Sequence, residues 1–166
     1  MGTMENLAAA FAGESQANRK YLAYAAKADK DGFPQVAKLF RAAAEAETIH
    51  AHAHLRAMGG INSTLENLQD AIAGEAHEFT EMYPEFISEA EKEGNKKAVT
   101  TFKFAMPVEE VHHGLYAKAL DAVKGGGDLP EASILICPVC GHTIEDCAPE
   151  KCPICNTPGT KYIEIS

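Results

Sequence analysis

Residues 47–50 of the chain read Glu-Thr-Ile-His, and residues 109–112 repeat the pattern as Glu-Glu-Val-His. Both motifs lie in stretches rich in Ala, Leu, Glu and Lys, which are strong helix formers. Residues three apart on a helix project from the same face, so each motif places a carboxylate beside an imidazole. One such motif alone is more typical of a solvated surface than of a binding site. The two motifs therefore indicate a binding site only if other features of the chain support one.

Glycine and proline divide the first 130 residues into helical segments. The sequence predicts four long helices, at about 4–30, 34–57, 65–93 and 96–124. The turns within the first pair and within the second pair are short, which predicts two antiparallel helical hairpins. Pro84 and Pro107 fall inside predicted helices and are expected to kink them.

The other two predicted helices each carry a matching glutamate. Glu14 precedes Glu47 by 33 residues and Glu75 precedes Glu109 by 34, which is the register of two similar hairpins. All four glutamates lie in apolar stripes of helical period. Buried carboxylates need cations, and one Glu from each of two helices with Glu-x-x-His from each of the other two is the arrangement of di-iron and di-manganese bundles. The donor types favour iron or manganese.

All five cysteines lie after residue 136. Cys137 with Cys140, and Cys152 with Cys155, form two CxxC pairs, a spacing typical of a tetrahedral zinc or iron site. The spacing leaves the choice between the two metals open. Cys147 is expected to be a free thiol. A flexible linker at Gly125–Ser133 predicts two domains, a helical one at 1–130 and a small β-rich metal domain at 131–166.

Composition excludes several classes of function. The chain has 166 residues, with 15 Lys and Arg against 24 Asp and Glu, and a formal net charge of −9. Phosphate backbones repel such a protein, so nucleic-acid binding is not expected. No apolar run reaches the length of a membrane span, and no secretory signal is recognised at the start. We therefore expect a cytoplasmic protein.

Together these features resemble the rubrerythrin family. The resemblance rests on Glu14–Tyr21 (ESQANRKY), Glu47-x-x-His50, Gly74-Glu75-x-x-Glu78, Met82–Phe86 (MYPEF), Glu109-x-x-His112 and the two Cys-Pro-x-Cys motifs. It covers nearly the whole chain. It implies a mainly α protein, a ferritin-like four-helix bundle followed by a rubredoxin-like domain. It also implies a non-haem peroxidase that reduces hydrogen peroxide to water with electrons from an Fe(Cys)4 centre.

The resemblance also implies roles for individual residues. The implied cofactors are two Fe in a carboxylate-bridged site and one Fe in a four-cysteine site, with Zn as the alternative occupant of the latter. The implied metal ligands are Glu14, Glu47, His50, Glu75, Glu78, Glu109 and His112, and in the tail Cys137, Cys140, Cys152 and Cys155. The implied catalytic residues are Glu78, His50, Tyr21 and Tyr83. His142 departs from the family, which has an aromatic residue at this position.

The implied partners are hydrogen peroxide, an electron donor such as a rubredoxin or an NAD(P)H-dependent reductase, and a second copy of the chain. In the implied homodimer, the tail of one subunit lies close to the di-iron site of the other. The short connection at 58–64 leaves open an exchange of helix pairs between chains. Two other functions remain open: a ferroxidase that oxidises Fe(II) with dioxygen, and a zinc-ribbon interaction module joined to a helical bundle.

Overall fold

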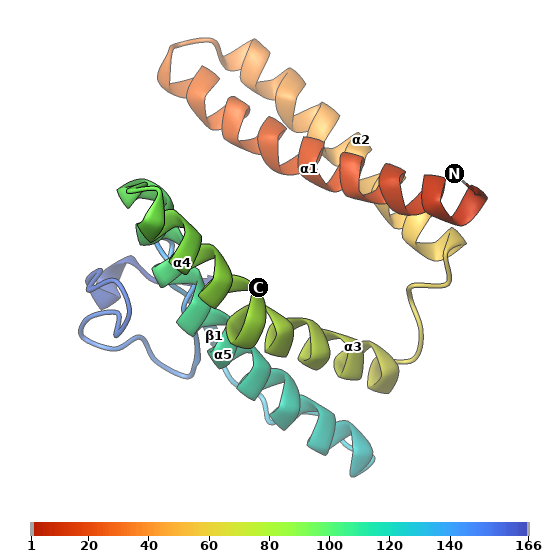
Figure 1. Cartoon of the computed structure of the whole chain (residues 1–166), viewed down its shortest axis with the longest axis vertical. Coiled ribbons are helices and arrows are strands. Elements are labelled where there is room, and N and C mark those ends of the chain that lie inside the picture. The colour runs from red at the N-terminus through yellow and green to blue at the C-terminus, as the bar shows by residue number, and fades with distance from the viewer. Residues whose placement is uncertain (1, 166) are drawn as a thin grey trace. The chain divides into compact units, whose positions relative to one another are not determined.

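The computed structural model describes residues 2–165, which divide into two compact units, one ending at Asn62 and the other beginning at Ser63. The first unit is a hairpin of two antiparallel helices, α1 (Thr3–Lys30) and α2 (Pro34–Ala57), seen side by side in Figure 1. Its buried residues are all alanines: Ala25, Ala28, Ala37, Ala44 and Ala51. Such small side chains let the two helix backbones approach closely.

The second unit contains the other helical pair. It begins at α3 (Thr64–His77), where the Ser63 hydroxyl accepts from the Glu66 backbone N–H at 3.3 Å, as expected for an N-cap. The π-helix η1 (Glu78–Met82) and α4 (Tyr83–Lys92) follow directly. The last helix, α5 (Lys96–Lys124), packs against α3, η1 and α4 and remains one helix with Pro107 inside it.

The segment predicted as one regular helix at 65–93 is interrupted just before Pro84. In η1 the backbone N–H of Tyr83 donates to the carbonyl of Glu78, five residues back, which inserts one extra residue into the turn. The inward face therefore moves by one position beyond this point. In an unbroken helix Phe86 would share a face with Glu75 and Met82, but it is 42% exposed, whereas Ala90 is buried at 5%.

The tail forms a three-stranded antiparallel sheet in the order β2-β1-β3. The strands are β1 (Ile134–Ile136), β2 (Thr143–Glu145) and β3 (Ile163–Ile165), and a short 3-10 helix, η2 (Gly159–Lys161), precedes β3. Leu135 of β1 pairs with Ile144 on one side and Glu164 on the other. β1 lies in the middle of this sheet, and β2 and β3 form its edges.

These observations confirm the predicted fold class, a mainly α protein with a small β-rich metal domain. The compact units do not follow the predicted boundary at residues 130 and 131, because the tail packs on α5 and so belongs with the second helical pair. The division into domains at 1–130 and 131–166 stays a prediction. Among the described residues, no helix is both long and apolar enough to span a membrane.

Candidate metal centres

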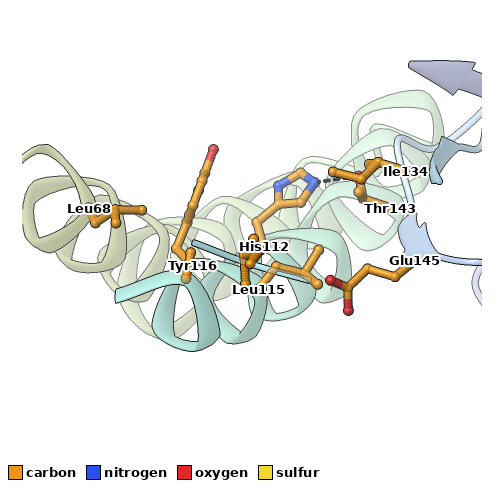
Figure 2. A pocket seen from close by; sticks show the side chains of 9 residues that line it. Leu68, His112, Leu115, Tyr116, Ile134, Thr143 and Glu145 are labelled. Atoms are coloured by element: carbon orange, nitrogen blue, oxygen red, sulfur yellow. Dashed lines mark hydrogen bonds between the residues drawn. The ribbon is translucent and has the colours of Figure 1, made fainter. Parts of the chain in front are cut away.

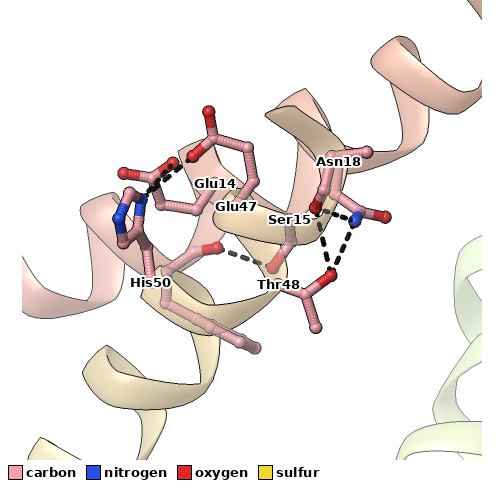
Figure 3. Close-up of polar contacts among 8 residues, drawn as sticks. Glu14, Ser15, Asn18, Glu47, Thr48 and His50 are labelled. Carbon is pink, nitrogen blue, oxygen red and sulfur yellow. Dashed lines mark hydrogen bonds and ion pairs between the residues drawn. The ribbon is translucent and has the colours of Figure 1, made fainter. Parts of the chain in front are cut away.

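The first unit brings together three of the predicted ligands. The Nδ1 atom of His50 lies 3.2 Å from Oε2 of Glu47 and 4.0 Å from Oε2 of Glu14 (Figure 3). The two glutamates are half-buried and His50 is exposed. A hydrogen bond with Glu47 raises the pKa of Glu14, and the same bond lowers the pKa of Glu47. Two carboxylates this close repel each other when both are ionised, and a bound cation would relieve that repulsion.

A polar contact fixes α1 against α2 beside this cluster. The side-chain amide of Asn18 donates to the carbonyl of Ala44 at 2.7 Å and to the hydroxyl of Thr48 at 2.8 Å (Figure 3). Asn18 lies one turn after Glu14, and Thr48 is next to Glu47. The contact therefore sets the register in which the two carboxylates meet.

The second unit holds a group of the same composition. The Nδ1 atom of His112 lies 2.8 Å from Oε2 of Glu109 and 3.9 Å from Oε1 of Glu75. All three residues are half-buried. Burial, together with the charge of Glu109 and a hydrogen bond to it, raises the pKa of Glu75 to about 7. Each unit therefore supplies a lone Glu from one helix and a Glu-x-x-His pair from its partner helix.

Glu78 and Tyr83 flank this second cluster at the two ends of the π turn. Burial and the charge of Glu109 raise the pKa of Glu78. Burial and the charges of Glu109, Glu78 and Glu75 raise the pKa of Tyr83, so its hydroxyl lies within the field of these carboxylates. Tyr21, the other predicted tyrosine, packs on the rings of Tyr24 and Phe40 in the first unit, with centroids 6.4 and 6.2 Å away.

The four predicted cysteine ligands lie together in the tail, with all four Sγ atoms within 4.8 Å of one another. Cys137 and Cys152 are buried, whereas Cys147 is exposed and outside the cluster, as expected for a free thiol. Each CxxC pair forms a turn, here called a knuckle, at Cys137–Cys140 and at Cys152–Cys155. Gly141 and Asn156, which directly follow the two knuckles, have φ of +87° and +61°. Their N–H groups donate to the carbonyls of Cys137 and Cys152. The knuckles are thus closed as the sequence predicts.

Hydrogen-bond donors surround the sulfur atoms. Burial opposes ionisation of Cys152, but hydrogen bonds from Tyr162 and from the backbone N–H groups of Cys155 and Ile154 outweigh it and lower the pKa to about 6. Backbone N–H groups also donate to Cys137 and Cys140. A thiolate-stabilising environment of this kind is what a bound metal requires.

The tail lies against α5 through three alternate residues, Gly141, Thr143 and Glu145. A Cβ at Gly141 would be 3.7 Å from Val108, the Thr143 hydroxyl is 3.0 Å from Nε2 of His112, and Glu145 pairs with Lys118 at 2.6 Å. The resemblance implied an approach of the tail to the partner subunit's site. Within this chain, however, the tail already contacts its own His112. The sequence did not predict a role for Thr143, because the short segment Thr143-Ile144-Glu145 has no pattern typical of a strand or of a binding site.

Figure 2 shows the pocket that this contact borders. Its volume is about 340 Å³, and its walls are mostly apolar. The lining residues labelled in the view are Leu68, His112, Leu115, Tyr116, Ile134, Thr143 and Glu145. His112 thus has one ring nitrogen toward the glutamates and the other toward the tail.

Two carboxylate–histidine clusters on helical pairs, with a four-cysteine site after them, define a non-haem iron protein of the di-iron carboxylate class. The donor sets thereby confirm the predicted cofactors, a di-iron site and an Fe(Cys)4 site. The family model for rubrerythrin matches residues 5–120. The chain belongs to the rubrerythrin family, whose members are di-iron proteins of oxidative stress defence.

Similar proteins match the sequence of this chain over nearly its whole length. Rubrerythrin-2 of Clostridium acetobutylicum is 35% identical over 96% of this chain and 95% of its own length. Nigerythrin of Nitratidesulfovibrio vulgaris is 37% identical over 94% of this chain and 83% of its own. A solved structure of nigerythrin in its fully reduced, all-ferrous state is 35% identical and covers 99% of this chain and 87% of its own, with a TM-score of 0.60.

Proposed function

We propose that this protein is a peroxidase that reduces hydrogen peroxide to water, with electrons entering through the four-cysteine centre. The observation that carries the proposal is the contact between Thr143 of the tail and His112 of α5. A ferroxidase needs no electron inlet, so a four-cysteine site joined to a ligand histidine favours peroxide reduction over oxidation of Fe(II) by dioxygen.

The proposal joins the two three-residue clusters into one di-iron site. Glu14, Glu47 and His50 form one half, and Glu75, Glu109 and His112, with Glu78, form the other. The two halves have the same donors on equivalent helices, so together they would hold two metal ions in a pseudo-two-fold site, with Glu47 and Glu109 as ligands that both ions would share. Iron at these sites would supply the chemistry, with the two electrons of peroxide reduction coming from the carboxylate site and their replacements from the four-cysteine site.

The chain's own residues hold and move protons. Glu78 lies at the start of the π turn, and its pKa is raised in the absence of metal, so once released from iron it would take up a proton more readily than an ordinary carboxyl. We assign it the role of delivering a proton to the departing peroxide oxygen. Burial and the charges of nearby glutamates raise the pKa of Tyr83, so its hydroxyl keeps its proton and remains available as a donor near these carboxylates. We assign Tyr21 a donor role in the first unit, and His50 the role of an iron ligand.

Thr143 orients His112 in this scheme. Its hydroxyl lies 3.1 Å from the Gly141 carbonyl, to which it donates, and it therefore accepts from Nε2–H of His112. With Nε2 protonated, the free lone pair is on Nδ1, the nitrogen that faces Glu109 and Glu75. The tail thus selects the tautomer that can bind a metal beside these carboxylates.

The proposal includes a homodimer and a rubredoxin-type or NAD(P)H-dependent electron donor. A two-helix hairpin whose buried residues are all alanines has little core of its own. Leu22, Leu39 and Ile49 of this hairpin are exposed. Those apolar side chains require a covering surface, which the second helical pair of the same chain or of a second copy would provide.

Turnover measurements with two oxidants test the function. Iron-loaded protein, reduced through a reductase and a rubredoxin, should consume hydrogen peroxide at a rate that depends on Cys137 and Cys152 of the tail. Cys147→Ser is the matched control, and Glu78→Ala should slow turnover. Fast Fe(II) oxidation by dioxygen with peroxide consumption that is indifferent to Cys152→Ser would instead identify a ferroxidase.

A further inference from the structure

The second cysteine knuckle is surrounded by side-chain hydroxyls as well as backbone amides. The Thr157 hydroxyl oxygen lies 3.1 Å from Sγ of Cys155. Its position is fixed by its own carbonyl, which accepts from the Cys152 N–H at 2.8 Å. A metal-bound thiolate has no proton, so in the loaded site the hydroxyl is the donor and the sulfur the acceptor.

Tyr162 approaches the other cysteine of this knuckle. It follows η2, and its hydroxyl is close enough to Cys152 to lower the pKa of that thiol. Its position depends on Gly159, since a Cβ there would lie 1.7 Å from the Pro149 carbonyl oxygen. Only glycine lets η2 come this close to the loop that precedes the knuckle.

Buried His142 determines the direction of the tyrosine's hydrogen bond. His142 is 7% exposed, and its Nδ1 lies 2.9 Å from the Tyr162 hydroxyl oxygen. The hydroxyl has one proton. Because a metal-bound Cys152 can only accept, Tyr162 donates to the sulfur and accepts from Nδ1–H of His142. The residues thus form a directed chain from His142 through Tyr162 to Cys152.

We infer that Tyr162 and Thr157 donate hydroxyl hydrogen bonds to two of the four iron-bound sulfurs, with His142 holding Tyr162 in place, and so raise the reduction potential of the Fe(Cys)4 centre. Reduction adds one negative charge to the four-thiolate site, and donors to sulfur stabilise the more negative state more strongly. The inference presupposes iron at the cysteines, but it does not depend on the peroxidase activity.

Spectroelectrochemistry of the iron-loaded full chain tests this inference through the visible ferric-thiolate absorbance. Tyr162→Phe and Thr157→Val should each lower the midpoint potential, with about a tenfold loss in the equilibrium constant for reduction, or 59 mV for a one-electron couple. Thr157→Ser, which keeps the hydroxyl, should retain the original potential. Tyr24→Phe and Thr101→Val, which remove hydroxyls from α1 and α5, serve as controls.

A double-mutant comparison isolates the role of His142. His142→Phe should lower the potential in the wild-type background and cause no further shift in a Tyr162→Phe background, because both act through the same bond. An equal shift in both backgrounds would overturn the positioning role. Unchanged potentials in both Tyr162→Phe and Thr157→Val would overturn the inference itself, whatever the peroxidase assay shows. If Tyr162→Phe fails to bind iron, the comparison of Thr157→Val with Thr157→Ser decides the matter.

Discussion

The Nε2 atom of His112 lies 3.0 Å from the hydroxyl oxygen of Thr143, which joins the four-cysteine tail to the histidine of the second carboxylate cluster. Thr143→Val removes this bond with little change in volume. We expect electron transfer from the reduced Fe(Cys)4 centre to slow by about tenfold or more, since loss of a hydrogen bond to a metal-binding histidine has effects of this size. This rate can be measured by stopped-flow spectroscopy, as the rate at which peroxide reoxidises the centre. Thr101→Val is the control, and an unchanged rate would remove Thr143 from the route.

Two complementary variants reveal whether the halves of the di-iron site come from one chain or two. Glu47→Ala disables the first half and Glu109→Ala the second. If each chain builds its own site, a mixed dimer of the two variants contains no intact site. If helix pairs are exchanged between chains, one of its two sites has both halves intact. Iron content and peroxide turnover of the co-expressed, doubly tagged dimer distinguish the two connections, with each variant alone as the baseline.

The raised pKa of Glu75 predicts a pH dependence of stability in the metal-free protein. Between pH 4.5 and about 7 the unfolded chain has lost the proton that folded Glu75 still holds. The unfolded state therefore binds fewer protons, and stability falls as the pH rises through this window. Glu75→Gln should recover about 1–2 kcal/mol at pH 8, allowing for solvent screening, and almost nothing at pH 4.

Urea unfolding of the metal-free protein at both pH values is the measurement. Exposed Glu110→Gln, which lies next to a ligand on α5, is the matched control and should change stability little at either pH. Equal effects of Glu75→Gln at pH 4 and pH 8 would argue against the buried, carboxylate-coupled state of Glu75.

Metal removal should unfold the tail and leave the helices folded. The three strands have three residues each, and only Cys137, His142, Cys152 and Gly159 are buried in this part of the described chain. A core this small depends on its metal. Chelation or Cys152→Ser should open residues 131–165 to proteolysis with little loss of helical circular dichroism. Cys147→Ser should stay resistant. A resistant metal-free tail would contradict the prediction.

Local sequence signals were sufficient for most of the secondary structure. The predicted helices at 4–30, 34–57 and 96–124 agree with α1, α2 and α5 to within a residue, since Gly and Pro mark their ends. The knuckle geometry also followed from residue type, because Gly141 and Asn156 tolerate a positive φ. The two ligand clusters could be predicted because their spacing is helical and local to each hairpin.

Features that depend on packing between distant segments could not be predicted. Thr143 meets His112 only because the tail folds back on α5 across 31 residues, and no periodicity encodes that return. The pairing of His142 with Tyr162 spans 20 residues of irregular chain. The one-residue shift at η1 also escaped prediction, since the apolar pattern of 65–93 can be fitted by a continuous helix almost as well.

The extra residue in the π turn η1 makes the middle of the 65–93 segment tolerant of a change in length. A π turn is a regular helix with one residue added, so removing the exposed Thr80 should return an ordinary helix in which Tyr83, Ile87 and Ala90 keep their inward positions. In evolutionary terms, the segment can gain or lose one codon here without reversing its buried and exposed faces. Sequence comparisons should therefore allow a gap at 78–82, inside what looks like an unbroken helix.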